Sequence, residues 1–124
     1  MDKSQYFYRT VVFTRKNNQV ALTNIHNPEE TTSLDDWPGI VLSLADGLHS
    51  IQELIGFMAS QYHGNPPAEL EKTLKSVFDR LLDGDFIKLS DKKVELPYYL
   101  AEPIEELDIE KAKKLMHEDG YTQH

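Results

Sequence analysis

The chain has no cysteine, and its 124 residues include one tryptophan, six glycines and six prolines. Without cysteine there is no disulfide, no thiolate nucleophile and no cysteine-ligated zinc or iron–sulfur site. No apolar run approaches the length that spans a bilayer, and the first residues lack the basic and apolar regions of a signal peptide. We therefore expect a cytoplasmic protein with no membrane partner. The length leaves room for one domain with a modest core.

Basic side chains are scarce where nucleic-acid binding would need them. The formal net charge is −8, and residues 27–64 contain no lysine or arginine. Their acidic side chains are Glu29, Glu30, Asp35, Asp36, Asp46 and Glu53. Proteins that bind nucleic acid usually carry a basic stripe, because neutralising phosphates supplies much of their affinity. We therefore expect no nucleic-acid partner.

Motifs of catalysis and cofactor binding are also lacking. The sequence has no GxGxxG, no GxxxxGK[ST] and no GxSxG pattern, and none of its five histidines has the HExxH spacing. Adjacent acids such as Glu105 and Glu106 are more often solvated or helix-capping than catalytic, since a catalytic pair needs a cleft with shifted pKa values. We expect a protein that is not an enzyme, with no catalytic residues, no cofactor and no metal site.

Residues rich in β-branched and aromatic types predict strands at 8–14 and 20–25, joined by a turn at 16–19. Residues 27–30 are expected to break the second strand. Residues 31–34 favour a short third strand at the edge of the sheet. The alternative is that residues 31–34 are only a loop that leads into the next helix.

The stretch from Asp46 to Leu54 is the most informative local signal. Ser50 and Glu53 have the Ser-x-x-Glu spacing of a capping box, in which each side chain bonds the other residue's backbone N–H. We therefore expect a first helix from residues 35–38 to Gly47, a sharp Asp-Gly turn, and a second helix from Ser50 to about His63 with Gly64 as its stop. A third helix is expected to open at 65–67 and to end at Gly84.

The remaining residues predict a small hairpin and an appended helix. Residues 86–96 favour a two-stranded wing, residues 97–103 an extended linker, and residues 108–118 an amphipathic helix. The predicted fold is α+β and winged helix–turn–helix-like: a three-stranded antiparallel sheet, three helices, a small wing and a C-terminal helix. We expect residues 1–96 to form the main domain and residues 97–124 a C-terminal extension.

The predicted third helix has a wider apolar arc than one packing face requires. Its core face comprises Leu70, Leu74, Val77 and Leu81. Phe78 and Leu82 lie to one side of that face, next to Glu71 and Lys75. Either these two apolar residues pack against the wing or the appended helix, or they form one wall of an exposed groove.

The edge strand could supply the other wall of this groove. Its small β-branched residues offer unpaired backbone groups to which an extended peptide could add as a further strand, with its apolar side chains against the helix. The residues concerned are Thr31, Thr32, Ser33 and Leu34.

The chain resembles the pyrroloquinoline quinone D family (PqqD) and the wider set of RiPP recognition elements, which serve ribosomally made, post-translationally modified peptides. The resemblance covers roughly residues 8–90. Its motifs are the hairpin at 11–25, the apolar stretch 40–44 followed by Asp46-Gly47, the Ser50-Ile51-x-Glu53-Leu54 stretch, Tyr62, and residues 77–87.

This resemblance implies a peptide chaperone that binds a precursor (leader) peptide by β-augmentation and presents it to a modifying enzyme, often a radical S-adenosylmethionine enzyme. By position, the peptide would contact Thr31, Thr32, Ser33 and Leu34 on one side and Glu71, Lys75, Phe78 and Leu82 on the other. The alternative function is a winged-helix transcriptional regulator or a protein-docking domain. A homodimer is also possible, because edge strands can pair between copies of the chain.

Overall fold

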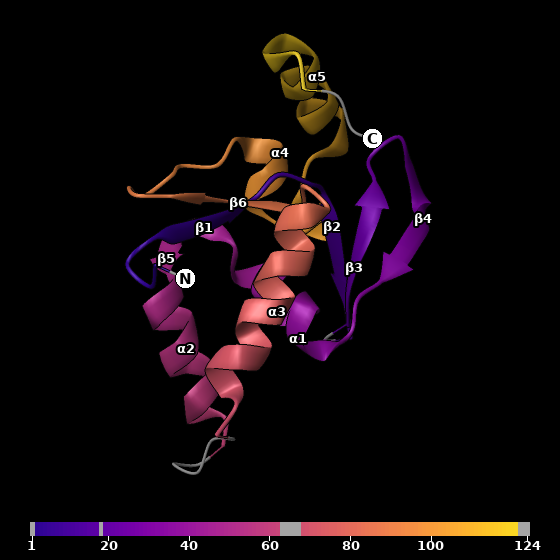
Figure 1. Ribbon diagram of the computed structural model, residues 1–124. Helices are drawn as coiled ribbons and strands as arrows, with labels where there is room; N and C mark the ends of the chain where they lie inside the picture. The colour runs from indigo at the N-terminus through magenta and orange to yellow at the C-terminus, as the bar shows by residue number, and fades with distance from the viewer. Residues whose placement is uncertain (1, 18, 63–67, 122–124) are drawn as a thin grey trace.

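The computed structural model describes residues 2–17, 19–62 and 68–121 of the chain. Within them the fold is α+β, with two small three-stranded antiparallel sheets and five α-helices (Figure 1). The elements run in the order β1 Tyr6–Arg9, β2 Phe13–Lys16, β3 Gln19–Asn24, β4 Asn27–Ser33, α1 Asp36–Leu44, β5 Asp46–Ser50, α2 Ile51–Ser60, α3 Leu70–Asp83, β6 Ile87–Ser90, α4 Tyr98–Ala101, a 3-10 turn Ile104–Glu106, and α5 Ile109–Asp119.

The strand predicted at residues 8–14 is in fact two strands that belong to different sheets. β1 is the middle strand of the sheet β5-β1-β6, and β2 is an outer strand of the sheet β2-β3-β4. The chain bends between them at Thr10, whose N–H donates to the Phe86 carbonyl at 2.9 Å and whose hydroxyl donates to the Asp85 carbonyl. The expectation of one strand over residues 8–14 is therefore wrong, because tertiary bonds at Thr10 divide one β-rich run.

The predicted hairpin is confirmed, but its third strand starts earlier than expected. β2 and β3 pair from Phe13 opposite Leu22 to Lys16 opposite Gln19. β4 begins at Asn27, which pairs with Asn24, and regular pairing resumes at Thr31 opposite Thr23, so residues 28–30 form an irregularity within the strand instead of ending it. Asparagine, proline and acidic residues are typical of loops, but an outer strand tolerates them because one of its sides needs no backbone donors.

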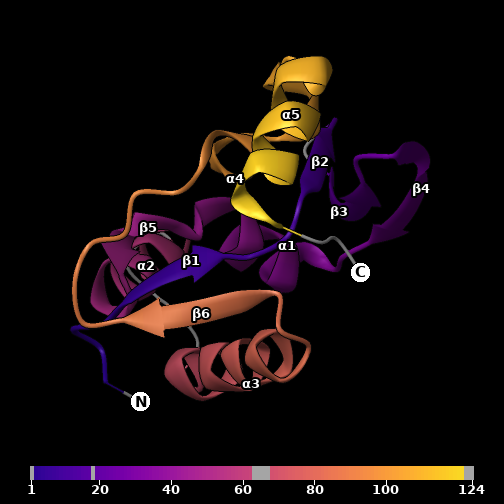
Figure 2. The same cartoon turned by 90° about the horizontal axis from the view of Figure 1, so that it is seen from above.

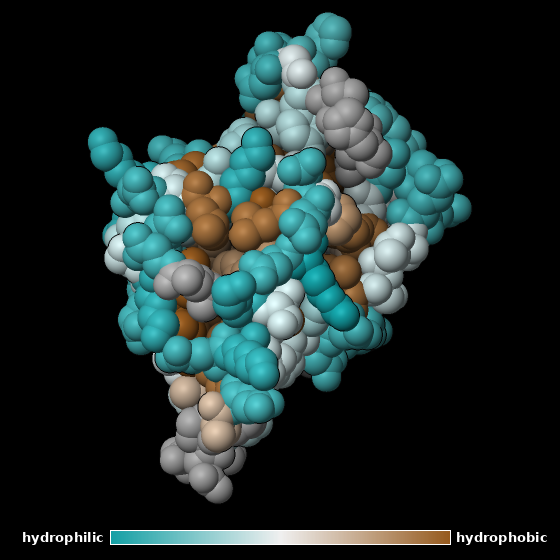
Figure 3. All heavy atoms as spheres, in the orientation of Figure 1, coloured by the Kyte–Doolittle hydropathy of each residue, from teal (hydrophilic) through white to brown (hydrophobic). Residues whose placement is uncertain are grey.

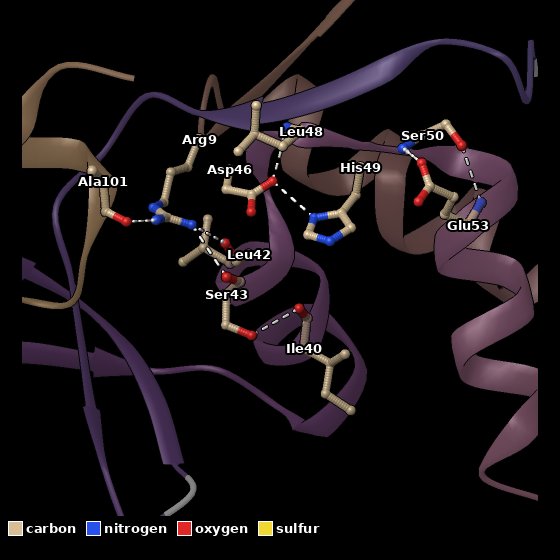
Figure 4. Close-up of polar contacts among 10 residues, drawn as sticks. All are labelled: Arg9, Ile40, Leu42, Ser43, Asp46, Leu48, His49, Ser50, Glu53 and Ala101. Atoms are coloured by element: carbon tan, nitrogen blue, oxygen red, sulfur yellow. Dashed lines mark hydrogen bonds and ion pairs between the residues drawn. The ribbon is translucent and has the colours of Figure 1, made fainter. Parts of the chain in front are cut away.

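Helix α1 and the capping box of α2 are confirmed. The Ser50 hydroxyl accepts from the Glu53 N–H at 3.1 Å, and the Glu53 carboxylate accepts from the Ser50 N–H at 3.1 Å (Figure 4). The sharp turn expected between these helices is wrong, because strand β5 separates them and pairs with β1. Gly47 in this strand has a φ of +80°, and a Cβ there would lie 2.2 Å from the Val94 carbonyl oxygen.

The limits predicted around the second and third helices fall partly outside the described residues. His63, Gly64 and residues 65–67 lie outside the described residues. Within the described residues α2 ends at Ser60 and α3 begins at Leu70, so the second helix is shorter than predicted and the third begins later. Gly84 ends α3 as predicted.

The predicted wing hairpin is wrong. β6 pairs with β1, with Leu89 opposite Phe7, because the bend at Thr10 leaves that edge of β1 open. Residues 94–96 form no strand, although the Val94 N–H donates to the Gly47 carbonyl at 2.9 Å. Residues 98–101 form the short helix α4 instead of an extended linker. This helix buries Tyr99 and Leu100.

The C-terminal helix is confirmed, and it packs with α4 over a second core. The Asp108 carboxylate caps α5 by accepting from the Lys111 N–H at 3.2 Å. The second core unites strand-region residues with the C-terminal segment; it contains Val12, Ile25, Tyr99, Leu100, Ile104, Leu107, Ala112 and Met116. The main core lies among α1, α2, α3 and the strands, and the two views place α4 and α5 on the other side of β1 (Figures 1 and 2).

A buried arginine joins these two cores. Arg9 is 2% exposed. Its guanidinium donates to the carbonyls of Leu42 at 3.3 Å and Ser43 at 3.2 Å, at the end of α1 (Figure 4). It also donates to the carbonyls of Leu100 at 2.6 Å and Ala101 at 2.7 Å, in α4. One side chain therefore ties the C-terminal segment to the first helix.

Backbone carbonyls, and no carboxylate among the described residues, accept the hydrogen bonds of this arginine. Among the described residues Arg9 makes no ion pair, and its guanidinium carbon lies 4.4 Å from the Phe13 ring centroid. Burial lowers the pKa of Arg9 to about 10, and the charges of Asp46 and Glu102 partly offset this effect. The guanidinium stays protonated at neutral pH, and the end of α1 presents to it the negative end of the helix dipole.

Arg9→Met should lower the free energy of unfolding by about 3 kcal/mol or more, because four backbone carbonyls, two of them in buried and two in part-buried hydrogen bonds, lose the guanidinium as a donor. Arg9→Lys should be intermediate, since an ammonium cannot reproduce the planar fork of donors. Urea denaturation measures both values. Arg15→Met is the control, because this exposed arginine should change stability by no more than about 0.5 kcal/mol. A loss for Arg9→Met no larger than the control's would contradict the role of Arg9.

Candidate functional site

The outer side of β4 is the open edge of the β2-β3-β4 sheet. No other described element pairs with it, and it lies at the margin of the molecule in both views (Figures 1 and 2). The Leu34 N–H donates to the Val20 carbonyl at 3.0 Å, so the backbone at this position faces β3. Because antiparallel pairing alternates along a strand, the N–H and C=O groups of Thr31 and Ser33 face outward.

The opposite edge of the same sheet is closed. The Arg15 N–H of β2 donates to the Glu105 carboxylate at 2.9 Å, and the Thr14 hydroxyl donates to the same carboxylate. Burial acts to raise the pKa of Glu105, but these hydrogen bonds outweigh it and the pKa is lowered. An unpaired strand edge invites pairing with other chains, and here the C-terminal segment covers β2 while β4 stays open.

An apolar hollow opens where β4 leads into α1. It measures about 220 Å³, and its apolar lining comes from Leu34 and Pro38 on one side and Leu81 and Phe86 on the other; Ser33, Asp35 and Arg80 also line it. We call this hollow the Phe86 groove. Figure 3 shows hydrophobic side chains in a band across this face, from β6 past the end of α3 toward β4. A strand added to β4 would have apolar surface beside it.

Phe86 owes its place to the way α3 ends. Asp85 has a φ of 59°, its N–H donates to the Leu82 carbonyl at 3.0 Å, and the Phe86 N–H donates to the Leu81 carbonyl at 2.9 Å. This pair of bonds is a Schellman motif, which turns the chain back over the helix end. A Cβ at Gly84 would lie 2.6 Å from the Phe86 ring, so glycine is needed there for the ring to lie against the helix.

The other face of the β2-β3-β4 sheet is polar. A hollow of about 470 Å³ lies over it, lined by Thr31 and Ser33 of β4. Charged side chains also line it: Lys16, Glu29 and Glu105. A strand added to β4 would therefore have a polar surface on one side and the Phe86 groove on the other.

The predicted strand half of the site is confirmed as a strand edge. Thr31, Thr32 and Ser33 lie in β4 and are exposed, and Leu34 follows them half-buried beside the main core. The alternative interpretation of these residues as a loop is wrong.

The predicted helix half lies elsewhere. Glu71 forms an ion pair with Lys3 at 2.9 Å, on the side of α3 toward α2, and Lys75 pairs with Asp79 on its own helix at 2.9 Å. Phe78 is 2% exposed, with its ring edge-on to Phe7 at 5.3 Å between centroids. Leu82 is half-buried against the same core.

The side chains that lie across the groove from β4 are Arg80, Leu81 and Phe86. The sequence predicts Phe78, Leu82, Glu71 and Lys75 for this wall. Helical periodicity does not indicate Phe86, because this residue follows the helix. The signal that could have found it is the Gly84-Asp85 pair, a helix stop that carries the next side chain back over the last turn.

No protein-family model, no curated protein and no solved structure matches this chain. The resemblance to the PqqD family therefore stays a prediction. Within residues 2–17, 19–62 and 68–121, no three histidine, aspartate or glutamate side chains could together hold a metal ion. None of the helices in those ranges is long and apolar enough to cross a membrane.

The closed edge of β2 predicts a pH dependence of stability. Because the pKa of Glu105 is lowered in the folded protein, its carboxylate stabilises the fold above the ordinary pKa, and this contribution disappears as the pH falls through the folded-state pKa. The protein should be more stable than its Glu105→Gln variant at pH 7, and the difference should shrink below the ordinary pKa of a glutamate and disappear below the lowered pKa of Glu105.

Urea denaturation over this pH range measures the difference. Glu106→Gln is the control, because the neighbouring side chain is exposed and has no hydrogen bond or ion pair among the described residues. An unchanging difference between Glu105→Gln and the parent protein from neutral to acid pH would contradict the role of the carboxylate.

Proposed function

We propose that this is a non-catalytic peptide-binding protein, which takes up an extended peptide as an additional strand on β4. The observation that carries the proposal is the outward-facing backbone of Thr31 and Ser33 beside the Phe86 groove. In this mode of recognition, main-chain hydrogen bonds supply affinity and alternate side chains supply specificity.

The unequal treatment of the two sheet edges supports this proposal. On β2, the outward N–H of Arg15 donates to the Glu105 carboxylate. On β4, the outward backbone groups of Thr31 and Ser33 pair with no strand among the described residues. An open edge is a liability that proteins usually blunt. An edge that is covered on β2 and left open on β4 is what we expect if β4 binds a ligand.

The resemblance stated above supplies the biological setting of the proposal. The bound peptide would be the leader of a precursor, and the protein would present it to a modifying enzyme such as a radical S-adenosylmethionine enzyme. We also propose a relation to winged-helix folds, supported by the order α1, β5, α2, α3, β6. Here β6 would be the only strand of the wing among the described residues.

The alternative of a DNA-binding regulator has less support. It requires a basic exposed side on the helix that would enter the groove of DNA. The exposed side of α3 instead mixes both signs: Glu71, Lys72, Lys75, Asp79, Arg80 and Asp83. Two of these charges are neutralised within the helix by the pair between Lys75 and Asp79.

Thr31→Pro should abolish peptide binding without unfolding the protein. Proline removes the outward N–H of Thr31, and an outer strand tolerates proline where the N–H faces solvent. Thr31→Val keeps the N–H and the β-branched shape, so it is the matched control. A random heptapeptide display library, panned against the parent protein, supplies ligands whose dissociation constants are then measured for all three proteins.

Enriched peptides should bind the parent and Thr31→Val proteins equally and lose binding to Thr31→Pro by at least about tenfold, while circular dichroism melts show that all three are folded. Failure to enrich any peptide, or equal binding by Thr31→Pro, would contradict the proposed function.

A further inference from the structure

We propose that the peptide which β4 accepts is a cationic amphipathic strand, with apolar side chains toward the Phe86 groove and basic side chains near both ends. This inference rests on the proposed function and names the chemical class of its ligand. It follows from the charges along the open edge and from the two faces of the sheet.

Acidic side chains flank the outward-facing backbone groups on both sides. Glu29 and Glu30 precede Thr31, and Asp35 and Asp36 follow the strand. All four carboxylates are exposed, and none forms an ion pair within the described residues. A bound strand would bring its two ends next to these carboxylates.

Three basic side chains lie near this edge, and Arg15 is the one that shares a hollow with both Asp35 and Asp36. Lys16 shares the polar hollow with Glu29 and Glu105. Arg80 lines the Phe86 groove, which Asp35 also borders. Acids outnumber bases in the polar hollow, and in the Phe86 groove one acid faces one base, so the excess of negative charge comes from Glu29 and from the exposed Glu30 and Asp36 at the two ends of the edge.

The register of an added strand determines which of its side chains meet which surface. Side chains directly opposite one another in paired strands lie on the same face, and opposite charges there attract. Residues opposite Thr31 and Ser33 would lie on the polar face, and residues opposite Thr32 and Leu34 would lie on the side of the Phe86 groove. Regular pairing of β4 covers Thr31 to Ser33. The two ends of a seven-residue strand centred there would extend past it, so basic residues at these ends would come close to Glu29 on one side and Asp35 on the other.

The same charges disfavour a second copy of this chain as the occupant of the edge. Two β4 strands that pair antiparallel about Thr32 would join the outward groups of Thr31 and Ser33 of each copy. In this register Glu29 of one copy faces Asp35 of the other, and like charges directly opposite are destabilising. A cationic peptide meets attraction at the same two places.

The test uses two synthetic heptapeptides that carry a fluorophore. Lys-Leu-Thr-Leu-Thr-Leu-Lys places leucine and threonine in the required alternation and reads the same in both directions, so it fits a parallel or an antiparallel strand. Glu-Leu-Thr-Leu-Thr-Leu-Glu has the same alternation with the opposite charge. Lys-Leu-Leu-Thr-Thr-Leu-Lys keeps the composition of the first and breaks its alternation.

The alternating lysine peptide should bind the parent protein about tenfold or more tightly than either comparator in fluorescence anisotropy at low salt. Its advantage over the glutamate peptide should shrink at about 1 M salt, because screening weakens exposed charge pairs. The double substitution Glu29→Lys with Asp35→Lys should reverse the preference between lysine and glutamate peptides. Glu110→Lys with Glu118→Lys is the matched control, since it changes the net charge equally on the exposed side of α5.

The outcomes separate the two proposals. Equal binding of the lysine and glutamate peptides would overturn the cationic class of ligand and leave strand addition in place. The same conclusion would follow if Glu110→Lys with Glu118→Lys reversed the preference as strongly as Glu29→Lys with Asp35→Lys does. Absence of binding by all three peptides would overturn strand addition together with this inference. Sedimentation of the free protein as a dimer that the lysine peptide does not dissociate would identify a second copy as the occupant.

Discussion

The guanidinium of Arg9 is the constraint on which the rest of the structure depends. A buried cation is tolerated only when its donors are satisfied, and here four carbonyls from two distant segments satisfy them. These bonds hold α4 against the end of α1. Because the 3-10 turn follows α4 directly, they also bring Glu105 within reach of β2. The closure of one sheet edge thus follows from the burial of one arginine.

This closure determines where another chain could add to the β2-β3-β4 sheet. With β2 covered by the C-terminal segment, the outward groups of Thr31 and Ser33 form its open edge among the described residues. The end of α3 places Phe86 beside that edge through the left-handed Asp85 and the close approach at Gly84. The arrangement combines main-chain donors and acceptors with an apolar surface, which is the combination that recognition by strand addition requires.

Features encoded by neighbouring residues could be predicted from the sequence, and features that depend on distant partners could not. The capping box at Ser50 and the amphipathic helix at residues 108–118 involve residues only a few positions apart, and both are confirmed. The division between β1 and β2, and the pairing of Phe7 with Leu89, depend on contacts about eighty residues apart. Nothing in the local pattern near Arg9 indicates that its partners are backbone carbonyls of α1 and α4.

The candidate site shows the same limit. The edge strand was predictable because the β-branched Thr31 and Thr32 favour an extended backbone whatever they contact. The helix wall was not, because periodicity shows which residues share a face but not which element that face meets. Phe78 faces Phe7 in the core, and Phe86 lies beside the edge because of the Schellman motif that ends α3.

The most direct test of strand addition is amide hydrogen exchange by NMR on the protein with and without the peptide Lys-Leu-Thr-Leu-Thr-Leu-Lys. The account predicts that the amides of Thr31 and Ser33 exchange more slowly in the complex, because the added strand accepts their hydrogen bonds. The Leu34 amide, already bonded to Val20, should change little. Peptide binding that leaves the exchange of Thr31 and Ser33 unaltered would contradict the central claim.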